Sequence, residues 1–258
     1  MSDPSTELPL ITDKERVRRL LALPGVRPDR LDRLRSARVA IVGIGGLGNA
    51  SAQYLAAQGV GHLTLIDGDR VDASNLGRQV LFGPADIGSF KVTAASKALL
   101  RLAPNCEVNA LPVYLAEHNG ASLIGSHDLI LDGLDSALPR QWINQWALTN
   151  GVPVIFAGAV GYEAQVLGVY GKPPCLSCLW PSLDGADVDC VTNGILGPLV
   201  GMIGSLQAAQ AINHLIGLAD RPGTLWTFDL FQGRSRVVSV PPNPSCPVCG
   251  PTGKEISL

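Results

Sequence analysis

Short apolar runs alternate with amphipathic segments along the first two thirds of the chain. The apolar runs are short enough for strands, whereas the segments between them place apolar residues at helical spacing. The pattern predicts strands at 38–42, 62–67, 108–113, 128–132 and 152–156 and helices at 13–23, 28–35, 49–58, 91–102 and 139–149. Strands that alternate with helices indicate an α/β protein with a mostly parallel sheet and helices on both faces.

The pattern changes after Gly158, where each segment is too short to close a core of its own. A long apolar segment at 194–218 carries amide and imidazole side chains that would be costly in lipid, which predicts a buried helix and no membrane span. The other segments predict antiparallel strands at 165–170, 225–230 and 235–240. We therefore expect an N-terminal helical arm at 1–36 and a single domain at 37–258, whose second half extends the sheet.

Composition excludes two classes of protein. Of the 258 residues, 46% are hydrophobic and 16% are charged, which excludes a disordered chain. Lys and Arg total 20 against 22 Asp and Glu, so no basic excess favours binding to nucleic acid. Because the first ten residues lack the pattern of a secretory signal, we expect a cytoplasmic protein with reduced cysteines.

A glycine-rich turn joins the first predicted strand to the helix after it. The turn fits a loop whose backbone N–H groups approach phosphate at a helix N-terminus, and its glycines are Gly43, Gly45, Gly46 and Gly48. Asp67 ends the next strand, 19 residues after Gly48, where a carboxylate can reach the hydroxyls of a ribose. The motif in this context indicates a Rossmann-like nucleotide site. The other interpretation is a purely structural glycine turn.

Polar residues after the second strand indicate more phosphate charge than a dinucleotide carries. Asp69 is followed by Asn75 and Arg78, and Lys91 opens the next predicted helix. A guanidinium forks onto phosphate oxygens and an ammonium supplies a point charge, so these residues suit a triphosphate. The alternative is a run of solvated surface charges.

Two carboxylates follow the strand predicted at 128–132, at the edge where open α/β sheets bind ligands. Asp135, on the loop, is the better ligand for Mg²⁺, which takes one or two protein carboxylates and completes its shell with phosphate oxygens and water. Asp132 fits a structural role, either as a helix N-cap or as a buried hydrogen-bond acceptor.

Four of the six cysteines form two Cys-x-x-Cys pairs that suit a structural, tetrahedral zinc site, with two disulfides or a redox pair as the alternatives. The predicted ligands are Cys175, Cys178, Cys246 and Cys249. Cys106 fits a small buried apolar residue. Cys190 lies in an aspartate-rich loop before the long helix. Its reactivity is open, because a helix N-terminus lowers the pKa of a thiol and nearby carboxylates raise it.

Together these motifs resemble the HesA/MoeB/ThiF family, the bacterial relatives of ubiquitin-activating enzymes. The resemblance extends from about Arg16 to Gly250. The residues at 178–181 and 246–250 are most similar to ThiF, with MoeB nearly as close. It rests on the glycine loop, the cysteine pairs, Asp67-x-Asp69, Asn75-x-x-Arg78-Gln79, Lys91, Asp135 and Cys190.

The resemblance implies an adenylyltransferase that uses ATP and Mg²⁺. Its substrate would be the C-terminal Gly-Gly carboxylate of a small ubiquitin-like sulfur carrier, and the pathway would be thiamine or molybdopterin cofactor synthesis. The family implies that Asp67 holds the ribose and Asp135 the Mg²⁺, and that the phosphates are held by Asn75, Arg78 and Lys91.

The family also implies a homodimer in which an N-terminal arginine reaches the ATP of the partner subunit. Arg19 fits this role best, with Arg18 as the alternative. Since no rhodanese-like extension follows Gly250, we expect a separate sulfur donor of the cysteine desulfurase or rhodanese type, and Cys190 is a candidate to capture the activated carrier. Two other functions stay open. An NAD(P)-dependent oxidoreductase would explain only the glycine loop and Asp67, and a non-catalytic scaffold would bind the ubiquitin-like protein without activating it.

Overall fold

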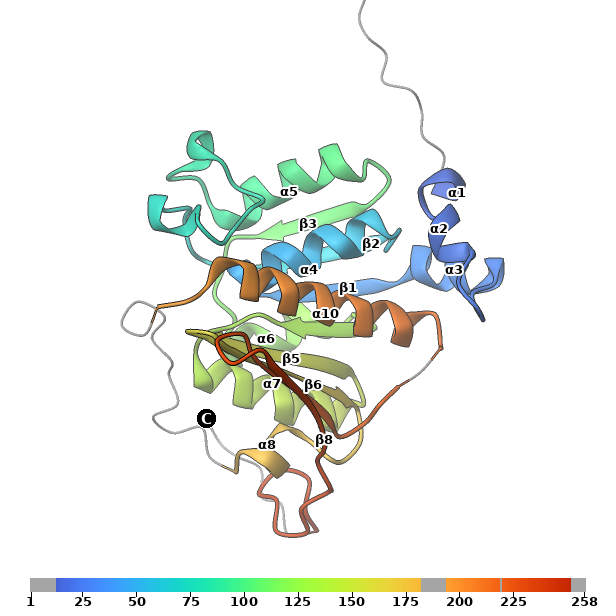
Figure 1. Cartoon of the computed structure of the whole chain (residues 1–258), viewed down its shortest axis with the longest axis vertical. Coiled ribbons are helices and arrows are strands. Elements are labelled where there is room, and N and C mark those ends of the chain that lie inside the picture. The colour runs from blue at the N-terminus through green and yellow to red at the C-terminus, as the bar shows by residue number, and fades with distance from the viewer. Residues whose placement is uncertain (1–12, 182–193, 219, 252–258) are drawn as a thin grey trace, which may run out of the picture.

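The computed structural model describes residues 13–181, 194–218 and 220–251, which form one eight-stranded sheet between two layers of helices (Figure 1). The strands are β1 (Arg38–Val42), β2 (His62–Ile66), β3 (Glu107–Leu111), β4 (Leu129–Asp132), β5 (Pro153–Val160), β6 (Glu163–Tyr170), β7 (Thr224–Asp229) and β8 (Arg234–Ser239). Their order in the sheet is β3-β2-β1-β4-β5-β6-β7-β8. The pairs from β3 to β5 are parallel, and those from β5 to β8 are antiparallel. The predicted α/β class with an antiparallel extension is confirmed.

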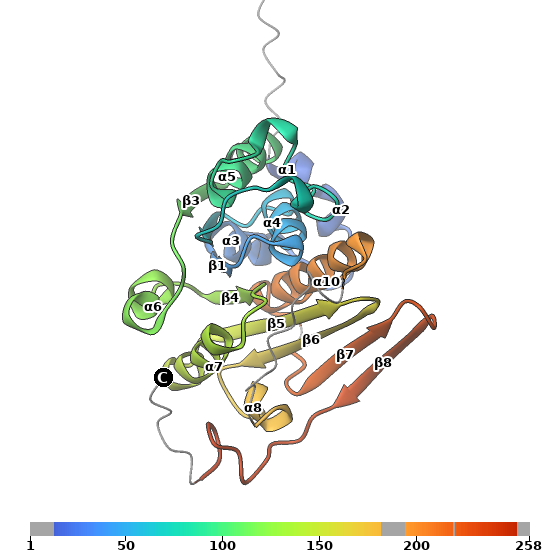
Figure 2. The same ribbon diagram turned by 90° about the vertical axis from the view of Figure 1, so that its left-hand side faces the viewer.

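Each face of the parallel half is covered by its own layer of helices (Figure 2). One layer contains α3 (Pro28–Ser36), α4 (Gly46–Ala57), α5 (Lys91–Leu102) and α10 (Gly197–Leu215), and the other contains α6 (Glu117–Ile124), α7 (Ala137–Asn150) and the short α8 (Leu176–Leu179). In β1, Val39 and Ile41 pack into the first layer, whereas Ala40 and Val42 pack into the second. Because successive side chains of a strand point to opposite faces, a strand covered on both faces is apolar throughout.

Some helices differ from the prediction. The segment 13–23 forms two short helices, α1 (Asp13–Arg16) and α2 (Arg18–Leu21), on either side of the buried Val17. The helix predicted from residue 49 already begins at Gly46. The sequence did not predict α6, since Gly120 lowers its helix propensity. A Cβ at Gly120 would lie 2.2 Å from the ring of Trp142, so close packing against α7 requires the glycine.

The long apolar segment forms α10, which lies beside α4 on one face of the sheet (Figure 1). A Cβ at Gly204 would lie 2.4 Å from the carbonyl oxygen of Leu47, so this glycine allows the two helices to approach. Gln207 is fully buried, and its amide donates to the carbonyl oxygens of Asp132 and Ile155, both at 2.9 Å. The prediction of a buried helix is confirmed. Within the described part of the chain, no helix is both long and apolar enough to span a membrane.

Candidate nucleotide site and metal centre

A cavity of about 590 Å³ opens at the carboxyl ends of β1 and β4. In the sheet, β2 and β3 lie on one side of β1, whereas β4 and β5 lie on its other side. The cavity therefore lies at the point where the strand order reverses. Open α/β sheets bind ligands at this point. Seven of the residues that the sequence proposed for the site line the cavity, namely Gly45, Gly46, Asp69, Asn75, Arg78, Lys91 and Asp135.

The glycines of the loop after β1 divide into two kinds. Gly43 has a φ of 89°, and a Cβ there would lie 2.7 Å from the carbonyl oxygen of Gly133. A Cβ at Gly48 would lie 2.0 Å from the carbonyl oxygen of Gly43. These two glycines therefore make the turn and let it approach the loop after β4. Gly45 and Gly46 line the cavity at the N-terminus of α4, where backbone N–H groups and the helix dipole favour an anion.

The carboxylate of Asp67 holds the glycine loop in place. Its Oδ2 accepts the N–H of Ile44 at 2.7 Å, and its Oδ1 accepts the N–H of Asp69 at 2.8 Å. Burial raises the pKa of Asp67, although Lys91 and the two N–H donors oppose this effect. Asp67 does not line the cavity, so its contact with a ribose stays a prediction.

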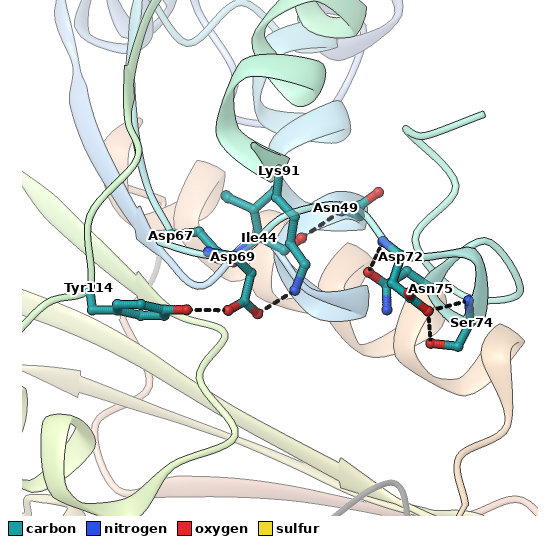
Figure 3. A network of polar contacts seen from close by, with 9 residues as sticks. All are labelled: Ile44, Asn49, Asp67, Asp69, Asp72, Ser74, Asn75, Lys91 and Tyr114. Atoms are coloured by element: carbon teal, nitrogen blue, oxygen red, sulfur yellow. Dashed lines mark hydrogen bonds and ion pairs between the residues drawn. The ribbon is translucent and has the colours of Figure 1, made fainter. Parts of the chain in front are cut away.

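Asp69 and Lys91 form a close ion pair at the cavity wall (Figure 3). Lys91 Nζ lies 2.6 Å from Asp69 Oδ2, and the lysine side chain is only 9% exposed. The hydroxyl of Tyr114 donates to Asp69 Oδ1 at 2.6 Å. Partial burial alone would raise the pKa of Asp69, but the hydrogen bonds from Lys91 and Tyr114 hold it below the usual value. The burial of Lys91 argues against a merely solvated surface charge.

Asn75 and Arg78 lie on the turn after β2, in and just beyond the short 3₁₀ helix η1 (Ala73–Asn75). Asn75 Oδ1 accepts the N–H of Asp72 at 3.0 Å, and Asp72 Oδ1 accepts the N–H of Ser74 at 2.8 Å (Figure 3). Arg78 donates from Nη1 to the carbonyl oxygen of Ser74 at 3.0 Å. This reciprocal cap fixes the turn and places both side chains at the cavity.

Gln79 also lines the cavity and is buried. Its Oε1 has no hydrogen-bond partner among the residues that the structure describes. A buried oxygen without a partner is costly, so a bound group or a water molecule is expected to complete this wall. The cavity and its cations fit a nucleotide triphosphate, and the partner of Gln79 Oε1 would be a hydrogen-bond donor such as a hydroxyl group, an amino group or water.

The loop after β4 presents Asp135 to the cavity, whereas Asp132 is fully buried. Asp132 Oδ1 accepts the N–H of Leu134 at 3.2 Å, and Oδ2 lies 2.7 Å from Nε of Arg140. Burial raises the pKa of Asp132 to about 6 against the opposing charge of Arg140. The expected role of Asp132 as a buried acceptor is confirmed.

Sequence reasoning missed Arg140, which also lines the cavity. Its Nη2 donates to the carbonyl oxygens of Leu134 and Ala157, so it braces the loop that carries Asp135. A signal was present, because Arg140 is the one charged residue in the segment that forms α7.

The four cysteines of the two pairs converge at α8, with Cys178 inside this helix and Cys175 directly before it. Their sulfur atoms all lie within 4.8 Å of one another, with separations of 3.6 Å for Cys175 and Cys246 and 3.3 Å for Cys178 and Cys249. All four are free thiols, with sulfurs too far apart for a disulfide. A tetrahedral set of thiolates fits zinc.

Asn144 of α7 supports this cluster from inside the core. It is fully buried, its Oδ1 accepts the N–H of Leu176 at 3.0 Å, and its Nδ2 lies 3.6 Å from the sulfur of Cys175. An N–H donor beside a metal-bound thiolate stabilises its charge. The cluster therefore joins the C-terminal segment to α7.

We expect about one zinc per chain in protein purified under reducing conditions, because four thiolates complete one tetrahedral shell. Cys249→Ser should release the metal and expose the segment after β8 to protease. Cys106→Ser is the matched control, since Cys106 is buried away from the cluster and its pKa is raised by burial to about 11. Elemental analysis reports the metal, and wild-type protein without zinc would refute the assignment.

The remaining predicted residues lie elsewhere. Arg18 and Arg19 are exposed on α2 and do not line the cavity of their own chain. Cys190 lies outside the described residues. Cys106 is buried in the core, as expected.

The model of the ThiF family matches residues 17–248. The sulfur carrier protein adenylyltransferase of Thermus thermophilus is 38% identical over 94% of this chain and 93% of its own length. The molybdopterin-synthase adenylyltransferase of Escherichia coli is 38% identical over 79% of this chain and 83% of its own length.

Among solved structures, E. coli MccB crystallised with ATP superposes with a TM-score of 0.81. The match covers 92% of this chain and 74% of MccB at 23% identity. At that identity the likeness shows the fold alone.

Proposed function

Because this chain belongs to the ThiF family, we propose that it uses ATP to adenylate the C-terminal carboxylate of a small ubiquitin-like sulfur carrier protein. It is an adenylyltransferase, as are the relatives that match it over most of its length. One observation carries the proposal: a single cavity gathers the helix N-terminus at Gly46, the cations Arg78 and Lys91, and the carboxylate of Asp135. An oxidoreductase would leave these cations and the carboxylate without a use, and no relative reported above is one.

The reaction needs alignment and charge neutralisation more than a base. A C-terminal carboxyl has a reference pKa of about 3.3–3.7, so it is ionised at neutral pH. Its oxygen forms a bond to the α-phosphorus of ATP, the bond from that phosphorus to the bridging oxygen breaks, and pyrophosphate leaves with the electron pair. Fixed positive groups facing the departing phosphates stabilise the transition state.

Different residues in and behind the cavity would align the phosphates, hold the metal ion and bind the ribose. Asn75, Arg78 and Lys91 would bind the phosphates, and Arg78 and Lys91 would neutralise charge on the leaving pyrophosphate. Asp67, behind the glycine loop, would receive the ribose. Asp135 would hold Mg²⁺, which supplies further positive charge on the phosphate oxygens when bound.

A homodimer would complete the site. Arg18 and Arg19 are exposed and do not line the cavity of their own chain, so both are available to a site on another subunit. We propose that Arg19, or Arg18 in its place, reaches the ATP of the partner subunit. After adenylation, a separate donor of the cysteine desulfurase or rhodanese type would supply sulfur to the carrier, for thiamine or molybdopterin cofactor synthesis.

Exchange of radiolabelled pyrophosphate into ATP tests this proposal. We expect exchange that depends on Mg²⁺ and on a carrier ending in Gly-Gly, and no exchange with the same carrier lacking its last glycine. A fluorescence titration with NADH tests the oxidoreductase alternative in parallel. Binding of NADH without any carrier-dependent exchange would contradict the proposal, and binding of a carrier without exchange would favour a non-catalytic scaffold.

Replacing Cys190 by alanine should leave pyrophosphate exchange unchanged, because adenylation needs no thiol. Sulfur transfer to the carrier should fall only if Cys190 forms a covalent link with it. The two steps are measured separately, by exchange and by formation of the carrier thiocarboxylate. Full sulfur transfer by Cys190→Ala would exclude a covalent role for this thiol.

A further inference from the structure

Tyr114 lies on the segment after β3 and is held in place although its side chain is exposed. The residue is 66% exposed, yet its hydroxyl donates to Asp69 Oδ1 at 2.6 Å (Figure 3). Its ring lies across Gly68, where a Cβ would come within 2.6 Å of the ring carbon Cε2. The hydrogen bond to Asp69 raises the pKa of Tyr114, so the hydroxyl keeps the proton that it donates.

Asp69 connects Tyr114 with both Lys91 and the glycine loop. Its carbonyl oxygen accepts the N–H of Lys91 at 2.9 Å, and its Oδ2 lies 2.6 Å from Nζ of the same lysine. Its own N–H donates to Asp67, which in turn accepts the N–H of Ile44. A continuous series of hydrogen bonds therefore extends from the loop after β1 to Tyr114.

The ion pair with Lys91 alone does not fix the orientation of the Asp69 carboxylate, so a second contact matters. The side chain of Asp69 is 48% exposed, so solvent weakens its ion pair with Lys91 and a single contact holds its orientation less firmly than two. The hydroxyl of Tyr114 occupies one carboxylate oxygen while Lys91 occupies the other, so the carboxylate is held in one orientation. The ammonium of Lys91 then has one fixed position at the cavity wall.

We propose that Tyr114 is a positioning residue for Lys91, acting through the Asp69 carboxylate to set where the ammonium meets the β- and γ-phosphates of ATP. The inference rests on the proposed function, because it takes ATP as the ligand of the cavity. Tyr114 itself does not line the cavity, and its effect on the nucleotide passes entirely through Asp69 and Lys91.

The test uses Tyr114→Phe in the full chain, which keeps the ring against Gly68 and removes the hydroxyl. Affinity for a non-hydrolysable ATP analogue, measured by titration calorimetry with Mg²⁺, should fall about tenfold, the effect of one hydrogen bond to a charged group. Affinity for AMP, which has no β- or γ-phosphate, should not change. Tyr54→Phe, at an exposed position on α4, is the matched control and should bind both ligands like the wild type.

A double-mutant cycle separates positioning from a structural effect on the loop. In a Lys91→Ala background, Tyr114→Phe should cause no further loss, because the group that it positions is gone. Unchanged ATP affinity in Tyr114→Phe would overturn the proposal, and so would an equal loss for AMP or a loss that persists without Lys91. If the wild type fails to bind the ATP analogue at all, the proposed function itself falls, which is a different result from any of these.

Discussion

Replacing Asp135 by alanine is expected to abolish magnesium-dependent pyrophosphate exchange while leaving the fold intact. Asp135 lies on the loop after β4 and lines the cavity beside the phosphate-binding residues. Mg²⁺ uses few protein carboxylates, so the loss of one removes a large part of its binding site. The fold should survive because the buried contacts of this loop are made by Asp132 and Arg140.

The matched control is Asp32→Ala, which removes an exposed carboxylate on α3 far from the cavity lining. It should retain wild-type exchange. Thermal melting curves of both variants should overlay that of the wild type. If Asp135→Ala exchanged pyrophosphate at the wild-type rate over a full range of Mg²⁺ concentrations, Asp135 would have no part in the mechanism.

Lys91→Ala and Arg78→Ala are each expected to lower pyrophosphate exchange by about 10²–10³, the usual effect of removing one oriented donor from a transition state. Both cations line the cavity, and that of Lys91 is fixed by Asp69. The rate at saturating ATP and carrier should carry most of the loss, because charge grows on the leaving pyrophosphate.

Lys97→Ala is the control for these variants, since Lys97 is exposed on the same helix as Lys91 and does not line the cavity. It should behave like the wild type. Wild-type exchange in Lys91→Ala or Arg78→Ala would restore the simpler interpretation of that residue as a surface charge.

The layered sheet could be predicted because the spacing of apolar residues and glycines within each strand, helix and turn is enough to identify that element. Buried strands such as Arg38–Val42 read as apolar runs, and Gly43 and Gly48 occur where the backbone leaves no room for a Cβ. The cysteine pairs could be joined across the chain because four thiolates at this spacing have few other uses in a reducing setting.

The features that the sequence did not predict depend on contacts between residues of different helices, strands and loops. No local pattern shows that Gly120 allows α6 to pack on Trp142, or that Tyr114 bonds to Asp69 across 45 residues. Asp67 was found by its spacing from the glycines, but its bonds to backbone N–H groups appear only when the loop is folded. Arg140 lies outside any motif and gains its role by reaching back from the first turn of α7 to Asp132 at the end of β4.

Activation of a Gly-Gly carboxylate by this chain is tested most directly by the intact mass of the carrier after the reaction. The chain is incubated with ATP, Mg²⁺ and each member of a panel of small ubiquitin-like proteins ending in Gly-Gly, and the carriers are then weighed by mass spectrometry. At least one carrier should gain the mass of an adenylyl group, which is AMP less one water, with the wild type, and it should not gain this mass with Asp135→Ala. If every carrier stays unmodified while the wild-type chain binds ATP, the chain does not activate a Gly-Gly carboxylate and the account is wrong.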